Sequence, residues 1–414
     1  MHPKPAFSLS RPLREVIYAD MSTQAHETGF QPPRHGPFKA GPRTPAERRT
    51  PLVGMDRGEL TAFVEQLGEP KFRAKQLYHW IHHRGATDFD QMTTLAKGLR
   101  ARLPEVASLD RPMVKDKQVS HDGTIKWLLR LADLQEVEAV FIPEEDRGTL
   151  CISSQVGCTL TCRFCHTGTQ RLVRNLSAGE MLGQIMLARD ELNEWPTPKD
   201  GRRLTNIVLM GMGEPLYNYD AVAKMIRQAM DGDGLGFSRR RITLSTSGVV
   251  PMMQPCGEEL GVNLAVSLHA VDDATRDYLV PLNKKYPLDQ LMAACRAYPG
   301  LNNARRITFE YVMIDGVNDS PAEARQLVRL LDGIPAKVNL IPFNPWPGTE
   351  FECSSPEAIE RFSDILYAAN LSAPVRTPRG QDIMAACGQL RSESQRQKKS
   401  VRDAAAPAAA EPAG

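Results

Sequence analysis

The sequence has few cysteines for its length and no long run of apolar residues. Eight cysteines in 414 residues are too sparse for a disulfide-built fold, and four of them crowd between Cys151 and Cys165. Unpaired thiols near one another indicate a reducing cytosol and metal or redox chemistry. No stretch approaches the roughly eighteen apolar residues of a transmembrane helix, and the N-terminus lacks the continuous apolar segment of a signal peptide. We therefore expect neither a transmembrane helix nor a signal peptide.

A large excess of charge is also missing. The formal net charge is only +2, so attraction to a nucleic acid would have to come from local basic patches. The hydrophobic content of 42% is ordinary for a globular protein and sufficient for a large core. Residues 1–50 are rich in Pro, Gly, Arg, Ser and Thr, and residues 392–414 are first basic and then rich in Ala and Pro. Both ends are predicted to be disordered extensions.

Residues 51–110 predict a small helical domain. Asp56 is a candidate N-cap with Glu59 three residues later, and an amphipathic helix follows it. A second short helix is predicted in "FRAKQLYHWIHHRG" (72–85), with Phe72, Leu77, Trp80 and Ile81 as its apolar face. The expected surface of this domain carries Lys71, Arg73, Lys75, Tyr78, His79, Trp80, His82, His83 and Arg84. Such clustered cations and aromatic side chains suit contact with an RNA backbone, and the simpler alternative is a solvated face over a small core.

Strands dominate from residue 111, and strands alternate with helices from residue 149. Residues 111–148 contain two strand-like runs and are predicted to form a short β-rich extension. Residues 149–391 contain six strand-then-helix units, beginning with "TLCISS" (149–154) and ending with "AKVNLIPF" (336–343) and its helix. Sustained alternation predicts a parallel sheet covered by helices, and six units are too few for a closed eight-stranded barrel. The predicted fold class is α/β, a partial (β/α)6 barrel with its chemistry at the carboxyl ends of the strands.

The segment "CISSQVGCTLTCRFCHTG" (151–168) carries the strongest chemical signal. Cys158, Cys162 and Cys165 follow a predicted strand with the spacing C-x3-C-x2-C. Structural zinc usually takes four ligands, often as two short pairs, and His166 adjoins Cys165 too closely to close a tetrahedral site without strain. Three thiolates on a four-iron cluster leave one iron open for another ligand. The pattern therefore favours an iron–sulfur cluster over zinc.

This triplet, with Phe164 before its last cysteine, resembles the signature of the radical S-adenosylmethionine (radical SAM) superfamily. The resemblance implies one [4Fe-4S] cluster. The segment "MGMGEP" (210–215) ends the next predicted strand, where glycines let the backbone approach a ligand and Glu214 can hold an amino group. Alone, such a strand end is more often a tight turn. After the triplet it resembles the superfamily's element for the methionine moiety of S-adenosylmethionine.

Seven segments together resemble one family within this superfamily, the RlmN-type adenine C2 methyltransferases. Those enzymes act on large-subunit ribosomal RNA and transfer RNA. The resemblance spans roughly residues 56–391. The segments are "VEAVFIPEEDRGTLCISSQVGCTLTCRFCHTG", "NIVLMGMGEPLYN", "RRITLSTSGVVP", "VSLHAVDDATRDYLVPLNKKYPL", "ITFEYVMIDGVND", "KVNLIPFNPWPG" and "VRTPRGQDIMAACGQL".

The resemblance implies a role for each candidate residue. Cys387 would be the methyl carrier, Cys151 its redox partner and Glu138 the proton acceptor. The implied positions for contact with the cofactor are Gly213, Glu214, Ser245, Ser267, Leu268, His269 and Asn344. Without the resemblance, both cysteines would be interpreted as packing residues and Glu138 as the polar face of a strand.

The implied chemistry explains why a cysteine is needed. Adenine C2 is too electron-poor to attack a sulfonium methyl group, whereas a thiolate can. One S-adenosylmethionine would methylate Cys387, and a second would yield the radical that activates the S-methyl group for addition to C2. Glu138 would then take the C2 proton, and Cys151 would release the RNA by forming a disulfide with Cys387.

The implied partners are 23S ribosomal RNA, with the target in the peptidyl-transferase region, and transfer RNA, with the target adenosine next to the anticodon. We also expect an electron donor such as flavodoxin, no membrane contact, a cytoplasmic location and a monomer. The basic segment "FSRRR" (237–241) supports an RNA partner. Access to a single base is expected to need local unstacking.

Three alternatives remain. C8 methylation of the same ribosomal adenosine would use the same cysteines, although the match over "NKKYPL" (283–288) and the helical domain favours C2. A non-catalytic RNA-binding iron–sulfur protein would need neither Cys151 nor Cys387. A radical enzyme acting on a small molecule would not need the basic clusters.

Overall fold

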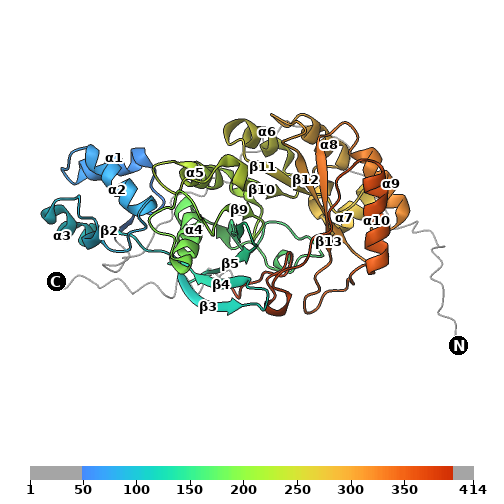
Figure 1. Cartoon of the computed structure of the whole chain (residues 1–414), viewed down its shortest axis with the longest axis horizontal. Helices are drawn as coiled ribbons and strands as arrows, with labels where there is room; N and C mark the ends of the chain where they lie inside the picture. Colours follow the sequence, from blue (N-terminus) through green and yellow to red (C-terminus); the bar gives the residue numbers. More distant parts are fainter. Residues whose placement is uncertain (1–48, 395–414) are drawn as a thin grey trace, which may run out of the picture. The chain divides into compact units, whose positions relative to one another are not determined.

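The computed structural model describes residues 49–394, so the predicted disordered extensions lie almost wholly outside the described residues (Figure 1). Its centre is a nine-stranded sheet with the strand order β13-β12-β11-β10-β9-β6-β5-β4-β3. The strands from β6 to β13 in this order pair in parallel. They are β6 (Gly148–Cys151), β9 (Asn206–Leu209), β10 (Ile242–Thr246), β11 (Asn263–Ser267), β12 (Ile307–Met313) and β13 (Ala336–Pro342). The predicted α/β partial barrel of six units is confirmed.

A helix follows each parallel strand. The helices are α4 (Ala178–Leu192), α5 (Tyr219–Met230), α6 (Val250–Glu259), α7 (Asp273–Leu279), α8 (Leu288–Arg296), α9 (Pro321–Leu330) and α10 (Pro356–Ala368). Figure 1 shows α10 beside β13 and α9, which it contacts. Ser177 and Ser320 each close a capping box with a glutamate three residues later, which fixes where α4 and α9 begin. Helix α7 was not predicted because seven residues are too few to show a period.

The β-rich extension completes the sheet. Its strands β3 (Met113–Val119), β4 (Ile125–Arg130) and β5 (Glu136–Pro143) pair antiparallel, and β5 pairs antiparallel with β6. Strand β3 is almost wholly exposed, so its polar sequence shows no apolar alternation and it was not predicted. Strand β5 is buried over most of its length and brings Val140 opposite Cys151. The extension therefore continues the sheet beside β6, the strand that carries Cys151.

The residues around 51–110 form α1 (Arg57–Gln66), α2 (Phe72–His82), α3 (Lys97–Val106) and a short parallel pair, β1 (Thr50–Pro51) and β2 (Ala107–Ser108). The predicted capping box at Asp56 is confirmed, because its side chain accepts from the backbone N–H of Glu59 at 2.9 Å. Among residues 49–394, no helix is both long enough and apolar enough to cross a membrane.

Two expectations about the surface of α2 are wrong. Tyr78 is 1% exposed and His82 is 0% exposed, although both were expected on the surface. They lie one helical turn apart and face Gly234, in the turn after α5, where an added Cβ would come 3.1 Å from His82 and 3.2 Å from Tyr78. Phe72, expected on the apolar face, is 58% exposed instead. The sequence pattern of α2 could not show that a second segment of the chain covers this side of the helix.

Candidate active site

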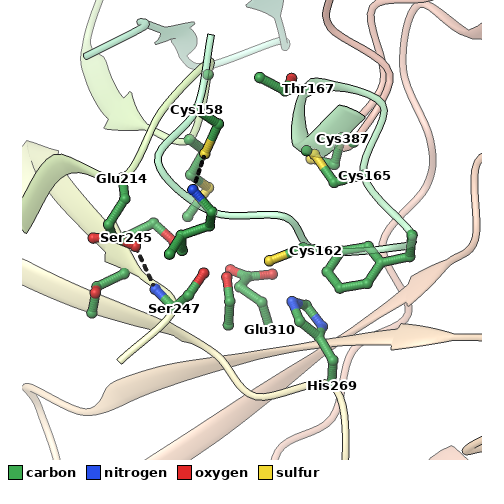
Figure 2. Close-up of a pocket in the computed structure, with 18 of the residues that line it drawn as sticks. Cys158, Cys162, Cys165, Thr167, Glu214, Ser245, Ser247, His269, Glu310 and Cys387 are labelled. Atoms are coloured by element: carbon green, nitrogen blue, oxygen red, sulfur yellow. Dashed lines mark hydrogen bonds between the residues drawn. The ribbon is translucent and has the colours of Figure 1, made fainter. Parts of the chain in front are cut away.

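Most of the predicted site residues converge on one cavity at the carboxyl ends of the parallel strands (Figure 2). Those that line it are Cys158, Cys162, Cys165, Gly213, Glu214, Ser245, Ser267, His269 and Cys387. Leu268 is fully buried beside the cavity, and Asn344 lies behind Cys387 rather than in the lining. Neither Glu138 nor Cys151 lines the cavity. Segments more than 200 residues apart in the sequence thus build one site.

The three cysteines of the triplet lie in the loop after β6. This loop is tied down where β7 (Gln155–Val156) pairs with β8 (Arg174–Asn175). Within it the backbone N–H of Leu160 donates to Cys158 Sγ at 3.3 Å. Burial raises the pKa of Cys158 to about 12 and also raises the pKa of Cys165. Buried thiols of this kind become thiolates when they ligate iron, because the metal compensates their charge.

The arrangement of donors suits a cluster better than a single ion. Among the described residues, no three His, Cys, Asp or Glu side chains converge as they would around one metal ion. A [4Fe-4S] cluster binds each cysteine through a different iron, so its three sulfur ligands must surround a larger volume. Cys158, Cys162 and Cys165 stand around one shared cavity in this way (Figure 2).

The glycine-rich end of β9 forms the wall next to the triplet. Gly213 has φ +103°, and an added Cβ would lie 2.6 Å from Cβ of Gln155, so a side chain there would be strained and would clash. Gln155 in turn accepts from the backbone N–H of Glu214 at 3.0 Å. The close approach of these two loops therefore requires glycine at this position.

Glu214 is a buried carboxylate at the bottom of this wall. It accepts from the backbone N–H of Leu216 at 3.1 Å and of Ser247 at 2.8 Å, the latter drawn in Figure 2. Burial raises its pKa to about 7 despite these two hydrogen bonds. Such a carboxylate can accept a hydrogen bond from the amino group of a bound ligand.

The ends of β10 and β11 form the opposite side. The buried guanidinium of Arg276 donates to the backbone carbonyls of Ser247, Ser267 and Leu268, which fixes both strand ends. His269 Nδ1 accepts from the backbone N–H of Val312 at 3.1 Å, and burial lowers its pKa to about 3, so the ring is neutral. These contacts hold the hydroxyl and imidazole groups of this side in fixed positions.

Cys387 enters the cavity on a separate segment near the C-terminus. Asn344 Nδ2 donates to the carbonyl of Cys387 at 3.3 Å, and the backbone N–H of His166 donates to the carbonyl of Gly388 at 2.7 Å. All eight cysteines are free thiols. Burial, followed by the charge of nearby Cys387, raises the pKa of Cys151 to about 12. The two cysteines are therefore close enough to influence each other electrostatically.

Glu138 lies behind the segment that carries Cys387. Its Oε2 accepts from the backbone N–H of Arg391 at 2.7 Å, and its Oε1 lies 3.3 Å from Nζ of Lys126. Burial raises the pKa of Glu138, although the charge of Lys126 opposes the shift. The carboxylate is thus held by the segment four residues beyond Cys387 and is suited to accept a proton.

Two charged residues of the cavity were not predicted from the sequence. Glu310, on β12, and Arg376, before the Cys387 segment, both line it. Glu310 is a charged residue in a strand whose seven residues are all buried, which is the signal that could have identified it. Arg376 lies within the segment "VRTPRGQDIMAACGQL" but has no local pattern that marks it.

Comparison with known protein families matches both parts of the chain. Residues 50–109 match the family model described as "Ribosomal RNA large subunit methyltransferase N-terminal domain", and residues 152–328 match the radical SAM superfamily. A solved structure, titled as a radical SAM methyltransferase from Sphaerobacter thermophilus, is 48% identical, has a TM-score of 0.78, and covers 83% of this chain and 99% of its own.

Curated relatives are similar over almost the whole length. The protein named dual-specificity RNA methyltransferase RlmN from Rhodospirillum rubrum is 61% identical over 380 residues, which is 89% of each chain. The protein of the same name from Acidiphilium cryptum is 63% identical over 352 residues, covering 84% of this chain and 90% of the relative. The chain therefore belongs to the RlmN family of radical SAM RNA methyltransferases, whose cofactors are a [4Fe-4S] cluster and S-adenosylmethionine.

Proposed function

We propose that this chain methylates C2 of an adenosine in 23S ribosomal RNA and of the adenosine next to the anticodon in transfer RNAs. The dual specificity in the names of its relatives supports two classes of RNA substrate. The observation that carries the proposal is the position of Cys387. It reaches, from a distant segment, the same cavity as the cysteine triplet and lies close to Cys151. A protein that only bound RNA and a cluster would need neither arrangement.

In the proposed reaction Cys158, Cys162 and Cys165 hold the cluster, and the glycine-rich wall with Glu214 holds the amino end of S-adenosylmethionine. When bound, the reduced cluster and S-adenosylmethionine supply the radical that removes one hydrogen atom from a methyl group. Cys387 provides that methyl group, because its thiolate first takes it from another S-adenosylmethionine by displacement. The activated carbon on Cys387 then bonds to C2 of the adenine.

The remaining steps fall to Glu138 and Cys151. Glu138 accepts the C2 proton, for which its buried position and raised pKa are favourable. Once the carbon is bonded to C2, the adduct would give up the one electron that the electron donor supplied. Cys151, after losing its proton, would then attack the sulfur of Cys387, so that an S–S bond forms and the bond from that sulfur to the RNA-bound carbon breaks. This carbon would take a proton from solvent to become the methyl group of the released RNA. The pairing of β5, which carries Glu138, with β6, which carries Cys151, and the hydrogen bond from Arg391 to Glu138 support these two roles.

We also propose that the domain division follows the sequence prediction, with an RNA-contacting domain at 51–110, the β-extension at 111–148 and the catalytic barrel at 149–391. Exposed cations on α2 and in the turn after it support the RNA contact, among them Lys75 and Arg84. The enzyme would act as a monomer in the cytoplasm, where its RNA substrates lie, and would receive electrons from a donor such as flavodoxin.

Mass spectrometry of nucleosides tests this function. A deletion strain should lose 2-methyladenosine from both ribosomal and transfer RNA, and the wild-type chain should restore it. Cys387→Ala should restore none, because the carrier thiol is gone. Cys353→Ala is the matched control, since Cys353 is an exposed free cysteine that does not line the cavity, and it should restore the modification fully.

Two results would contradict the proposal. Loss of 8-methyladenosine instead of 2-methyladenosine would assign the enzyme to the C8 reaction. Restored methylation by Cys387→Ala would remove this cysteine from the mechanism.

A further inference from the structure

Arg376 is the side chain that contacts the sulfur of Cys387. Its Nη1 donates to Cys387 Sγ at 3.6 Å, within the range of hydrogen bonds to sulfur. Asn344 and His166 contact the backbone carbonyls of Cys387 and Gly388 instead. The backbone contacts fix the path of the segment, whereas Arg376 acts on the reacting atom itself.

Glu310 approaches the same guanidinium nitrogen, Nη1, that contacts the Cys387 sulfur. Its Oε2 lies 3.9 Å from Nη1 of Arg376, an ion-pair distance, and within residues 49–394 this oxygen has no hydrogen-bond partner. Asn339 Nδ2 fixes the second oxygen, Oε1, at 3.0 Å. The residue is only 4% exposed, so its charge would be unfavourable without a nearby cation.

Four titratable groups lie near one another at this point. Cys387 is the largest cause of the raised pKa of Arg376, and Glu310 and Cys151 raise it further. A guanidinium remains charged at every pH at which a protein works, and its fork of N–H groups can bond to two partners at once. Arg376 is therefore a permanently charged side chain. It lines the cavity, donates to the sulfur of Cys387 and lies near Cys151.

We propose that Arg376 is a further catalytic residue, that Glu310 is its positioning residue, and that together they hold the Cys387 sulfur where it meets the methyl donor and then Cys151. This inference rests on the proposed function of Cys387 as the carrier. In the methyl transfer the Cys387 thiol loses its proton to solvent and its sulfur electron pair forms the new S–CH3 bond. The electrons of the broken C–S bond stay on S-adenosylhomocysteine. Arg376 orients the attacking sulfur during this exchange.

The test measures methylation of Cys387 in a single turnover, without RNA or reductant. Full-length holoenzyme is mixed with S-adenosylmethionine that carries a deuterated methyl group, and the mass of the proteolytic peptide that contains Cys387 is measured over time. Arg376→Gln should slow labelling of unmodified Cys387 by about 10- to 100-fold, the effect of removing one charge-assisted hydrogen bond. Arg376→Lys keeps the positive charge but loses the planar set of guanidinium N–H donors. Its rate of labelling should fall between those of Arg376→Gln and the wild type. Glu310→Gln should slow labelling less, by roughly 3- to 10-fold, because Arg376 remains.

Arg379→Gln is the matched control. Arg379 lies three residues further along the same segment, and it forms an ion pair at 3.9 Å with Asp122, which does not line the cavity. It should label at the wild-type rate. Iron content, the thermal unfolding midpoint and equilibrium binding of S-adenosylhomocysteine are measured for every variant, because a merely structural role would change these quantities too.

The outcomes separate the inference from the function on which it rests. Slow labelling with S-adenosylhomocysteine binding changed by less than about threefold supports the inference. Labelling of Arg376→Gln at the wild-type rate, or a loss of binding by the same factor as the rate, would overturn it and leave the carrier function intact. A wild-type enzyme that never labels Cys387 would instead refute the proposed function, and the inference with it.

Discussion

Replacing Cys151 by alanine separates a packing role from a chemical role. Cys151 is the last residue of β6, pairs with Val140 of β5 and is partly buried. Removing one partly buried sulfur costs on the order of 1 kcal/mol of folding free energy, which should lower the unfolding midpoint by no more than about 4 °C. An effect of that size on the barrier would change turnover only about fivefold. If Cys151 is the nucleophile that releases the RNA, turnover should fall by more than about 100-fold.

The sharper expectation is a trapped product. Methylation of Cys387 and addition to C2 do not need Cys151, so they should proceed in Cys151→Ala and stop before release. Protein made in cells should then carry RNA bound covalently through Cys387 and stable in denaturant. Digestion with nuclease and protease, followed by mass spectrometry, should find adenosine on the peptide "GQDIMAACGQLR" (380–391).

A double variant and a matched control define what would refute this reasoning. Cys151→Ala combined with Cys387→Ala should carry no RNA, because the attachment point is missing. Cys353→Ala should turn over normally and carry none. Release of methylated RNA by Cys151→Ala at the wild-type rate, or an adduct on another cysteine, would show that the two-cysteine mechanism is wrong.

Two further predictions concern the cofactors. Anaerobically prepared protein should contain about four irons and four sulfides per chain, and Cys162→Ala should lose its brown colour and its cleavage of S-adenosylmethionine together; a colourless wild type with one zinc would contradict the cluster. Because the pKa of Glu214 is about 7, its carboxylate must lose a proton before it can accept from the ligand's amino group at lower pH. Binding of S-adenosylhomocysteine, measured by equilibrium dialysis, should therefore weaken by up to about tenfold per pH unit below pH 7 in the wild type. It should be weaker but nearly independent of pH in Glu214→Gln, and an unchanged pH dependence in that variant would assign the effect to another group.

The sequence predicted the parts of this protein that depend on local pattern. The capping box at Asp56 marks a helix start because its two residues lie only three positions apart. The six β/α units followed from alternating apolar runs. The triplet of cysteines could be assigned to a cluster because its ligands lie within eight residues of one another.

The features that the sequence did not predict depend on distant contacts. Tyr78 and His82 lie in a helix whose sequence is typical of an exposed helix. They are buried because the turn that contains Gly234 packs against them. Arg376 and Glu310 are 66 residues apart, and no spacing relates an exposed loop to a buried strand. Strand β3 is held by pairing with β4 rather than by an apolar face, so its own residues do not reveal it.

The late position of Cys387 in the chain has a consequence for synthesis. A ribosome makes the N-terminal end of a protein first, and here the cluster cysteines are complete 222 residues before the carrier appears (387 minus 165). The last described residues are also the ones that hold Glu138, through the backbone N–H of Arg391. A chain that stops a few dozen residues early would therefore keep the three proposed cluster ligands and every strand of the barrel while lacking the proposed methyl carrier. On the proposed mechanism, such a chain could hold the cluster but could not transfer a methyl group, so activity would depend on completed translation.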